Sequence, residues 1–235
     1  MKLPSAQTRR ALLAAAAACA STPALPRSAL AVDAKNPLIA ATSNLLPDES
    51  TTKVDADPVL DAIAWNAPKL TGLSTKKMAE RLDAGLRERE WFVTGRGLPE
   101  LFSDDFFFQD PDVSVTGIEP YCRQVRRLFD QSTARCEIVL CTATGPNAIT
   151  VVWRNSGKVN LGPVGFELKP YVVTTTLKTD SDSGLIAFQE DKFVVNGPEL
   201  LLYQIPALRS LTSPPAPSVQ ELQKQYDAAT GKLIV

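Results

Sequence analysis

Four segments rich in Val, Ile, Thr and Phe follow one another in the second half of the chain, and they constrain the fold more than any other feature. They cover residues 135–144, 148–154, 166–179 and 185–195. Turn-forming Gly, Pro, Asn, Asp and Ser separate them, at residues 145–147, 155–157 and 180–184. Since β-branched and aromatic residues favour strands, the sequence predicts an antiparallel meander of four strands.

Two amphipathic segments precede these strands. Ser74 is placed to cap a helix over residues 75–93, and Gly117 opens a second helix whose apolar residues recur at helical spacing. Between them the pattern predicts a short helix over residues 98–102. It also predicts a strand at Phe106-Phe107-Phe108-Gln109 that is buried on both faces. Helices followed by an antiparallel sheet indicate an α+β fold with helices covering one face.

The first 31 residues have the pattern of an export signal. Arg9 and Arg10 precede an Ala-rich apolar run that is too short to span a membrane, and Ala29-Leu30-Ala31 is a small-x-small processing site. The arginine pair favours twin-arginine export, and an ordinary Ala-rich helix is the alternative interpretation of the run. The predicted destination is the thylakoid lumen of a chloroplast, with a bacterial periplasm as the alternative.

The rest of the chain divides by composition into an extended arm, one folded domain, and a Pro-rich linker with a short polar helix. Their ranges are residues 32–73, 74–212 and 213–235. No further apolar run reaches membrane-spanning length, so the processed chain is expected to have no membrane span.

Composition excludes several classes of function. The chain has no His, which excludes Ser-His-Asp and Cys-His nucleophiles and His-liganded zinc. Its formal net charge is −1, and loss of residues 1–31 removes four basic residues and no acid, leaving −5. Nucleic acid is therefore not an expected partner. Cys122, Cys136 and Cys141 lack metal-ligand spacing, so no metal or cofactor is expected; Cys122 is predicted either to pair with one of the others or to stay free.

Leu101 to Pro111, with its Phe-rich strand and Asp-Pro ending, is followed by Gly117-Ile118-Glu119-Pro120-Tyr121. In this order of elements the chain resembles the nuclear transport factor 2-like superfamily, in particular its SnoaL-like and ketosteroid isomerase-like members. The resemblance covers about Ser74 to Leu211. It implies a cone-shaped curved antiparallel sheet with helices packed on one face, of the cystatin-like α-β(4) type. Isomerases, cyclases, hydrolases and binding modules share this fold, so the resemblance does not choose among these functions.

The resemblance makes Asp110 the candidate general base, because steroid isomerases of the family carry their base after the first strand. Asp110 shares a strand face with Phe106 and Phe108, whose rings would desolvate it and raise its pKa. The alternative is that Asp110 caps the turn through Pro111. Two features argue against steroid isomerase chemistry: the helix over residues 75–93 has no Tyr, and hydroxyls around Thr174 stand where the family has a protonated Asp.

The last strand supplies the remaining candidates. Gln189 and Asp191 share one face of it and Glu190 and Lys192 the other, and one of these pairs must face the inside of the cone. Asp191 is the second candidate for catalysis. Tyr121 is expected on the inner face of its helix, as a proton donor or as part of the core.

The predicted catalytic residues are thus Asp110, Asp191 and Tyr121. The predicted ligand-binding residues are Phe106, Phe108, Trp153, Thr174 and Gln189, with core packing as the alternative for Trp153. The first hypothesis for function is a binding module for a small apolar molecule or a partner protein. The second is a cofactor-independent isomerase or cyclase that uses Asp110 as its base. The third is an interaction protein that forms a homodimer through its sheet.

Overall fold

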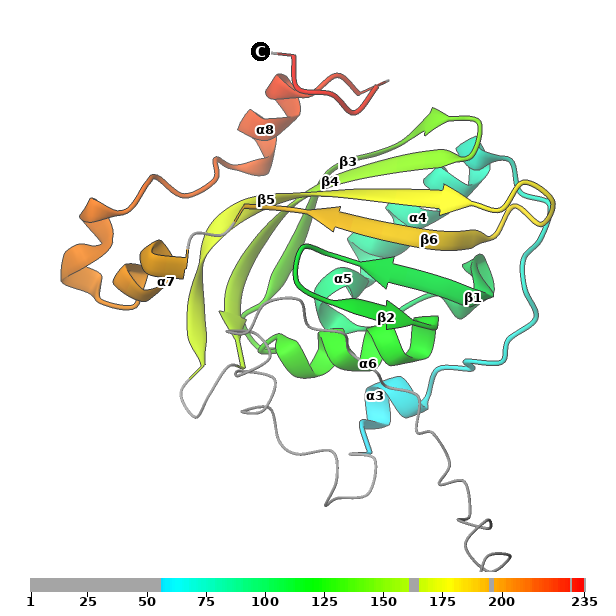
Figure 1. The fold of residues 1–235 in the computed structure, drawn as a ribbon, viewed down its shortest axis with the longest axis horizontal. Helices are drawn as coiled ribbons and strands as arrows, with labels where there is room; N and C mark the ends of the chain where they lie inside the picture. The colour runs from blue at the N-terminus through cyan, green and yellow to red at the C-terminus, as the bar shows by residue number, and fades with distance from the viewer. Residues whose placement is uncertain (1–55, 161–164, 195–196, 229, 235) are drawn as a thin grey trace, which may run out of the picture. The chain divides into compact units, whose positions relative to one another are not determined.

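A six-stranded sheet in the order β2-β1-β6-β5-β4-β3 is the centre of the computed structural model, which describes residues 56–160, 165–194, 197–228 and 230–234. The strands are β1 (Phe102–Gln109), β2 (Ser114–Thr116), β3 (Arg135–Gly145), β4 (Ala148–Val159), β5 (Phe166–Thr179) and β6 (Ile186–Lys192). The export signal and most of the predicted arm fall within residues 1–55, outside the described residues. Figure 1 shows that β3, β4 and β5 are long and strongly curved.

Helices lie against the inner face of this curve (Figure 1). The helices and 3₁₀ turns are α3 (Pro58–Asp61), α4 (Thr75–Arg89), α5 (Trp91–Thr94), η1 (Pro99–Leu101), α6 (Ile118–Leu128), α7 (Gly197–Tyr203), η2 (Pro206–Leu211) and α8 (Val219–Gln225). The core lies between α4, α5, α6 and the sheet, and fully buried Trp91, Phe92 and Phe102 are among its largest side chains. The predicted α+β class, with helices on one face of a curved sheet, is confirmed.

The sheet has one pairing that the meander did not predict. β3 to β6 pair antiparallel in sequence order as expected, but β1 joins the edge of β6 in parallel, and β2 folds back on β1 as a short hairpin. Parallel neighbours need a long crossover connection, which the whole segment from α6 to β5 provides. Because β1 and β6 are paired neighbours, their side chains alternate together, and the inward-pointing ones of both strands lie side by side on the inner face.

The strand around Phe107 is not buried on both faces as predicted. Phe106 and Phe108 are buried against the helices, whereas Phe107 points outward, is 36% exposed and stacks on Phe188 of β6 at 6.2 Å between ring centroids. The outer face of an antiparallel hairpin next to solvent explains this alternation.

The helix predicted over residues 75–93 is broken in two at Glu90. This residue has φ 48°, in the left-handed region that a non-glycine residue rarely adopts. Its carboxylate accepts hydrogen bonds from the Arg135 guanidinium and, at 2.9 Å, from the backbone N–H of Cys136. Tertiary contacts with the start of β3 thus stabilise a break that no local sequence signal indicated.

The turn predicted at residues 155–157 is also wrong, because β4 runs on to Val159. Gly157 has φ 108° and lies at a shift in the register between β4 and β5. A Cβ atom at this position would lie 2.4 Å from the carbonyl oxygen of Thr133. Glycine is therefore needed for a close approach of two backbones within a strand, and Asn155 is a strand residue that faces inward.

The C-terminal segment covers part of the outer face of the sheet. Ser218 and Glu221 form a capping box at the start of α8, as the predicted short helix requires. Leu222 of α8 is buried and packs in a small apolar cluster with outward-facing side chains of β3 and β4, among them Leu140 and Val152. Figure 1 shows α8 on the side of the sheet opposite to α4.

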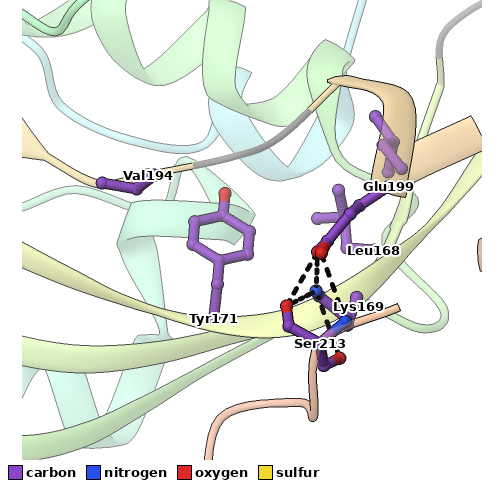
Figure 2. Close-up of a pocket in the computed structure, with 7 residues that line it drawn as sticks. Leu168, Lys169, Tyr171, Val194, Glu199 and Ser213 are labelled. Carbon is purple, nitrogen blue, oxygen red and sulfur yellow. Dashed lines mark hydrogen bonds and ion pairs between the residues drawn. The ribbon is translucent and has the colours of Figure 1, made fainter. Parts of the chain in front are cut away.

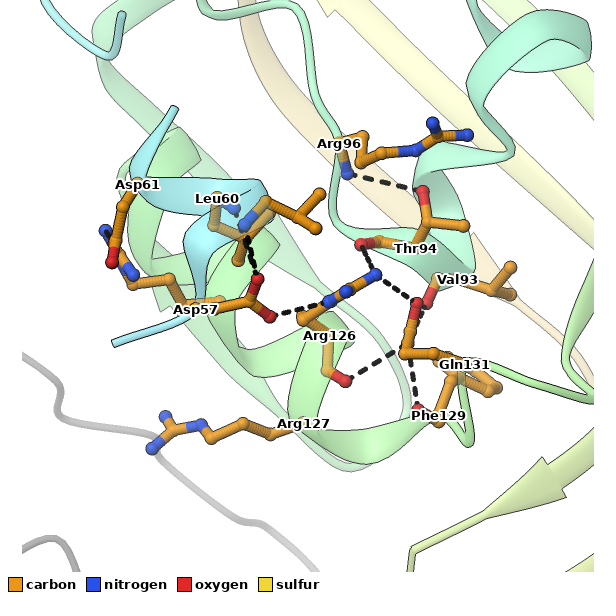
Figure 3. Close-up of polar contacts among 12 residues, drawn as sticks. Asp57, Leu60, Asp61, Val93, Thr94, Arg96, Arg126, Arg127, Phe129 and Gln131 are labelled. Atoms are coloured by element: carbon orange, nitrogen blue, oxygen red, sulfur yellow. Dashed lines mark hydrogen bonds and ion pairs between the residues drawn. The ribbon is translucent and has the colours of Figure 1, made fainter. Parts of the chain in front are cut away.

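The described end of the predicted arm is held on α6 by charged side chains (Figure 3). Asp57 accepts hydrogen bonds from Val59 N and Leu60 N, which caps α3, and its other oxygen accepts one from Arg126 Nε at 2.7 Å. Arg123 likewise pairs with Asp61 at 3.0 Å. Since Leu60 is also buried, this part of the chain is packed against the domain.

Candidate functional site

A cavity of about 120 Å³ lies between the inner face of the sheet and α6. Its walls are mainly aromatic and aliphatic, and the aromatic residues other than tyrosine are Phe92, Phe108, Phe129, Trp153 and Phe193. Polar groups reach it from β4, β5, β6, α6 and the turn after β1. A small apolar space with few converging polar groups is the usual form of a ligand site, although this one is smaller than the ~300–1,000 Å³ of drug-sized sites.

Asp191 of β6 is the most buried charged group in this cavity. Its neighbour in the sheet register is Thr175 of β5, and both side chains point inward. Thr175 Oγ1 donates to Asp191 Oδ1 at 2.7 Å, and Gln189 Nε2 donates to the same oxygen at 3.2 Å. Both of these hydrogen bonds are to Oδ1, so Oδ2 is the oxygen that they leave to the cavity.

The hydroxyl proton of Thr175 has its direction set by Trp153. The indole Nε1–H of Trp153 donates to Thr175 Oγ1 at 3.0 Å, so the hydroxyl oxygen already accepts one hydrogen bond. The proton of that hydroxyl is then directed to Asp191. Trp153 is therefore both a wall of the cavity and the residue that orients the donor to the carboxylate.

Gln189 connects Asp191 to Tyr121. Its Nε2 donates to Tyr121 Oη at 3.1 Å as well as to Asp191 Oδ1. Tyr121 comes from α6 and lies between the rings of Phe106 and Phe108, with centroid distances of 6.0 and 4.6 Å. The phenol is thus held at the cavity wall by packing and by one amide.

The environment of Asp191 favours its neutral form. Burial raises the pKa of Asp191 to about 7, and the nearby negative charges of Asp110 and Glu190 act in the same direction. The hydrogen bonds from Thr175 and Gln189 oppose this rise. Burial likewise raises the pKa of Tyr121 well above its usual value, so its phenol is protonated at neutral pH. Asp191 therefore changes its charge in the pH range where a general acid or base is useful.

Asp110 both caps the turn after β1 and lines the cavity, the two positions predicted for it. Its Oδ1 accepts hydrogen bonds from Asp112 N at 2.7 Å and Val113 N at 2.6 Å, so it caps the turn between β1 and β2. The same side chain is part of the cavity lining, together with Phe108. The structure thus brings Asp110, Asp191 and Tyr121 to one cavity, with Asp110 at its edge.

The predicted ligand-binding residues have mixed positions. Phe108 and Trp153 line the cavity. Phe106 and Gln189 are fully buried behind it. The prediction for Thr174 is wrong, because Thr174 is on the outer face of β5 and its neighbour Thr175 points inward. Side chains of a strand alternate between its two faces, and the sequence did not fix which face is inward.

Asn155 and Gln124 are cavity residues that the sequence did not indicate. Asn155 Nδ2 donates to Tyr171 Oη at 2.8 Å, whereas Asn155 Oδ1 and Gln124 Oε1 have no hydrogen-bond partner within the described part of the chain. Asn155 was hidden in a segment interpreted as a turn. The signal for Gln124 was its position three residues after Tyr121 on the same helix, which places it on the same face.

A larger crevice of about 260 Å³ lies next to the cavity, between β5 and α7 (Figure 2). Tyr171 lines both spaces. The charged groups of the crevice are already paired: Lys169 Nζ binds Glu199 and donates to Ser213 Oγ at 2.6 Å. These contacts hold the C-terminal segment beside β5, and we therefore assign the crevice a structural role and the cavity the role of candidate site.

Within the described ranges, no group of three acidic or Cys side chains is placed to hold a metal ion. Cys122, Cys136 and Cys141 are free thiols, and burial raises the pKa of each. The disulfides considered from the sequence are therefore not formed. None of the described helices is both long and apolar enough to cross a membrane.

Several solved structures are similar to this chain in its α+β fold. One is a SnoaL-like polyketide cyclase from Jannaschia, with 13% identity, a TM-score of 0.42 and coverage of 58% of this chain and 96% of that chain. Another is a ketosteroid isomerase from Kribbella flavida, with 16% identity, a TM-score of 0.37 and coverage of 68% and 94%; both are described as putative in these functions. A ketosteroid isomerase-like protein from Catenulispora acidiphila, solved with trimethylamine, has 18% identity, a TM-score of 0.39 and coverage of 55% and 92%.

The descriptions of these structures, SnoaL-like and ketosteroid isomerase-like, are of the kinds that the sequence motifs resemble. No protein-family model matches the sequence, and a search of curated proteins finds no match. At such low identity and TM-scores, no activity, ligand or residue role is transferred from these proteins to this chain. The function must be argued from the cavity itself.

Proposed function

We propose that this domain binds a small molecule with an apolar body in the cavity, and that Asp191 holds the polar group of that molecule. The observation that carries the proposal is a buried carboxylate in an aromatic cavity with no basic side chain among the described residues that line it. A buried carboxylate normally has a cationic or metal partner, because its desolvation is expensive. Asp191 instead has two neutral donors on one oxygen.

Binding is tested by ligand-observed NMR with small aromatic and branched aliphatic probes against the full chain. Val173→Phe fills the cavity from β5, and Thr174→Phe adds the same ring on the outer face of the strand as its matched control. Binding that is lost in the first variant and kept in the second supports the proposal. Equal binding to both, with both folded by their amide spectra, contradicts it.

The second candidate function is acid–base catalysis of an isomerase or cyclase type, with the export and cofactor independence expected from the sequence. The observation that favours it is the pKa of Asp191 of about 7, beside the second carboxylate of Asp110 and the phenol of Tyr121. Because Asp110 Oδ1 already holds two turn amides, we propose Asp191 as the group that exchanges a proton and Asp110 as its electrostatic partner. Turnover of carbonyl compounds by wild type, its loss in Asp191→Asn and its retention in Asp110→Asn would support this assignment; the reverse pattern would restore Asp110 as base.

We further propose that the domain acts after export, in a thylakoid lumen or a periplasm, following removal of residues 1–31. N-terminal sequencing of the protein from fractionated cells tests this, and an intact Met1 in the lumenal or periplasmic fraction would contradict it.

We also propose that the domain forms a homodimer through its sheet. α8 covers the β3 and β4 part of the outer face, so a dimer would use the part around Phe107 and Phe188; light scattering of Phe107→Glu against wild type tests it.

A further inference from the structure

Several acceptors reach the cavity beside the hydroxyls of Tyr121 and Tyr171, and its formal charges are all of one sign. Asp110 and Asp191 are its two carboxylates, while neither Lys nor Arg occurs in its lining within the described ranges. Asn155 Oδ1 and Gln124 Oε1 add two acceptors without a partner in that part of the chain, and Asn155 is almost completely buried. A buried acceptor without a donor is unfavourable, so a ligand that supplies N–H donors and positive charge would stabilise these oxygens and the Asp191 carboxylate.

We propose that the ligand of this cavity is a small organic ammonium ion, that is, a protonated amine with a short branched or cyclic apolar group. The inference rests on the proposed binding function and names the ligand class for the same site. The ammonium N–H groups would donate to the Asp191 carboxylate and to Asn155 Oδ1, and the apolar group would fill the space between the rings.

The walls of the cavity suit a cation. Aromatic faces attract organic cations, more strongly when the site is desolvated than when it is exposed. Phe108 and Tyr121 lie 4.6 Å apart between centroids, Phe92 and Trp153 lie 5.3 Å apart, and all four rings line the space. The Asp191 carboxylate and several ring faces around one volume provide the charge complement of an alkylammonium ion.

The size of the cavity limits the ligand. An apolar cavity of about 150 Å³ holds one benzene molecule, which has six non-hydrogen atoms. The volume here is about 120 Å³, so the bound part of the ligand has roughly four to six non-hydrogen atoms. A steroid or another polycyclic molecule would extend well beyond this volume.

The groups that face Asp191 from every packed element are acids. They are Asp110 after β1, Tyr121 of α6, Cys136 of β3 and Tyr171 of β5, while Glu190 adds a nearby negative charge from the opposite face of β6. An ammonium ion would stabilise the ionised form of Asp191 against all of them. A neutral carbonyl ligand would instead accept a hydrogen bond from the protonated acid, and the two ligand classes therefore have opposite pH dependences.

Isosteric probes separate these two ligand classes. tert-Butylammonium is a cation with three N–H donors, tert-butanol has the same shape without the charge, and acetone presents a carbonyl. Each is titrated into the full chain between pH 5 and 9 by NMR, with the carboxyl carbon of Asp191 as reporter. We expect tert-butylammonium to bind at least tenfold more tightly than tert-butanol, with an affinity that rises about tenfold per pH unit below the pKa of Asp191 and levels off above it.

Variants complete the experiment. Asp191→Asn preserves shape and should weaken tert-butylammonium binding at least tenfold, whereas Glu88→Gln, which removes one exposed carboxylate on α4, should leave it unchanged. Equal affinities for the cation and tert-butanol would overturn the ammonium inference and leave the proposed binding function standing. Acetone binding that weakens as pH rises would do the same. Absence of binding by all three probes to the folded wild type would overturn both.

Discussion

Replacement of Thr175 by Val tests the hydrogen bonds that control Asp191. In the wild type, Thr175 Oγ1 donates to Asp191 Oδ1 at 2.7 Å and accepts from Trp153 Nε1 at 3.0 Å. Val has the shape of Thr but can make neither hydrogen bond. A hydrogen bond to a charged group is worth about 1.5–3 kcal/mol, and 1.36 kcal/mol of preference for the ionised form corresponds to one pH unit. We therefore expect the pKa of Asp191, now about 7, to rise by about one pH unit or more.

The same substitution leaves the buried indole N–H of Trp153 without its acceptor, which should lower the free energy of unfolding by about 1–3 kcal/mol. The pKa is measured by carboxyl-carbon NMR and the stability by urea unfolding. Thr175→Ser keeps the hydroxyl and should retain most of both properties, and Thr176→Val makes the same change on the outer face of β5. An unchanged or lowered pKa in Thr175→Val would refute the proposed direction of the Thr175 hydroxyl.

Three further predictions concern stability. The pKa of Asp191 is higher in the folded chain than in the unfolded chain, so its ionisation destabilises the fold by up to about 4 kcal/mol as pH rises from about 4 to 7. In urea unfolding at several pH values, Asp191→Asn should remove this fall of the unfolding free energy with pH. An equal fall in both proteins would contradict the burial argument. Leu222→Ala should lower the free energy of unfolding by about 2–3 kcal/mol, because this side chain is buried between α8 and the outer face of the sheet. Gln220→Ala, at an exposed position of the same helix, should change it very little. Equal losses in urea unfolding would show that α8 is not packed as described. Asp57→Ala should lower the free energy of unfolding by about 1–2 kcal/mol at pH 7 and speed proteolysis of the segment before α6. The loss should vanish at low pH, because the hydrogen bonds from Arg126 and two backbone amides outweigh burial and lower the pKa of Asp57. An equal loss at pH 3 would contradict this.

The sequence predicted the main elements because their signals are local. The strand-rich segments, the helix after Gly117 and the capped α8 all depend on residue type and spacing, and each was found where expected. The departures come from contacts between distant residues. The break at Glu90 depends on Arg135, and the passage of β4 through Gly157 depends on the backbone of Thr133.

The candidate site was predictable only up to the choice of strand face. Residue types on β6 indicated that either Gln189 and Asp191 or Glu190 and Lys192 would face inward, and the alternation cannot decide between them. The register between β5 and β6 decides, because it sets Asp191 opposite Thr175 on the face that packs on the helices. Asn155 was missed for the same kind of reason, since its inward position depends on the continuation of β4.

The cost of Asp191 to the fold also favours a function for the cavity. Much of the inner face of the sheet is built from apolar side chains that stabilise it, such as Ile149, Val151 and Leu177, all fully buried. At neutral pH the carboxylate of Asp191 costs the fold about 4 kcal/mol, a large share of the ~5–15 kcal/mol that holds a typical domain together. Groups that break the rules of a protein core in this way concentrate at sites that bind or react, and a ligand that restores the missing positive charge would remove the penalty.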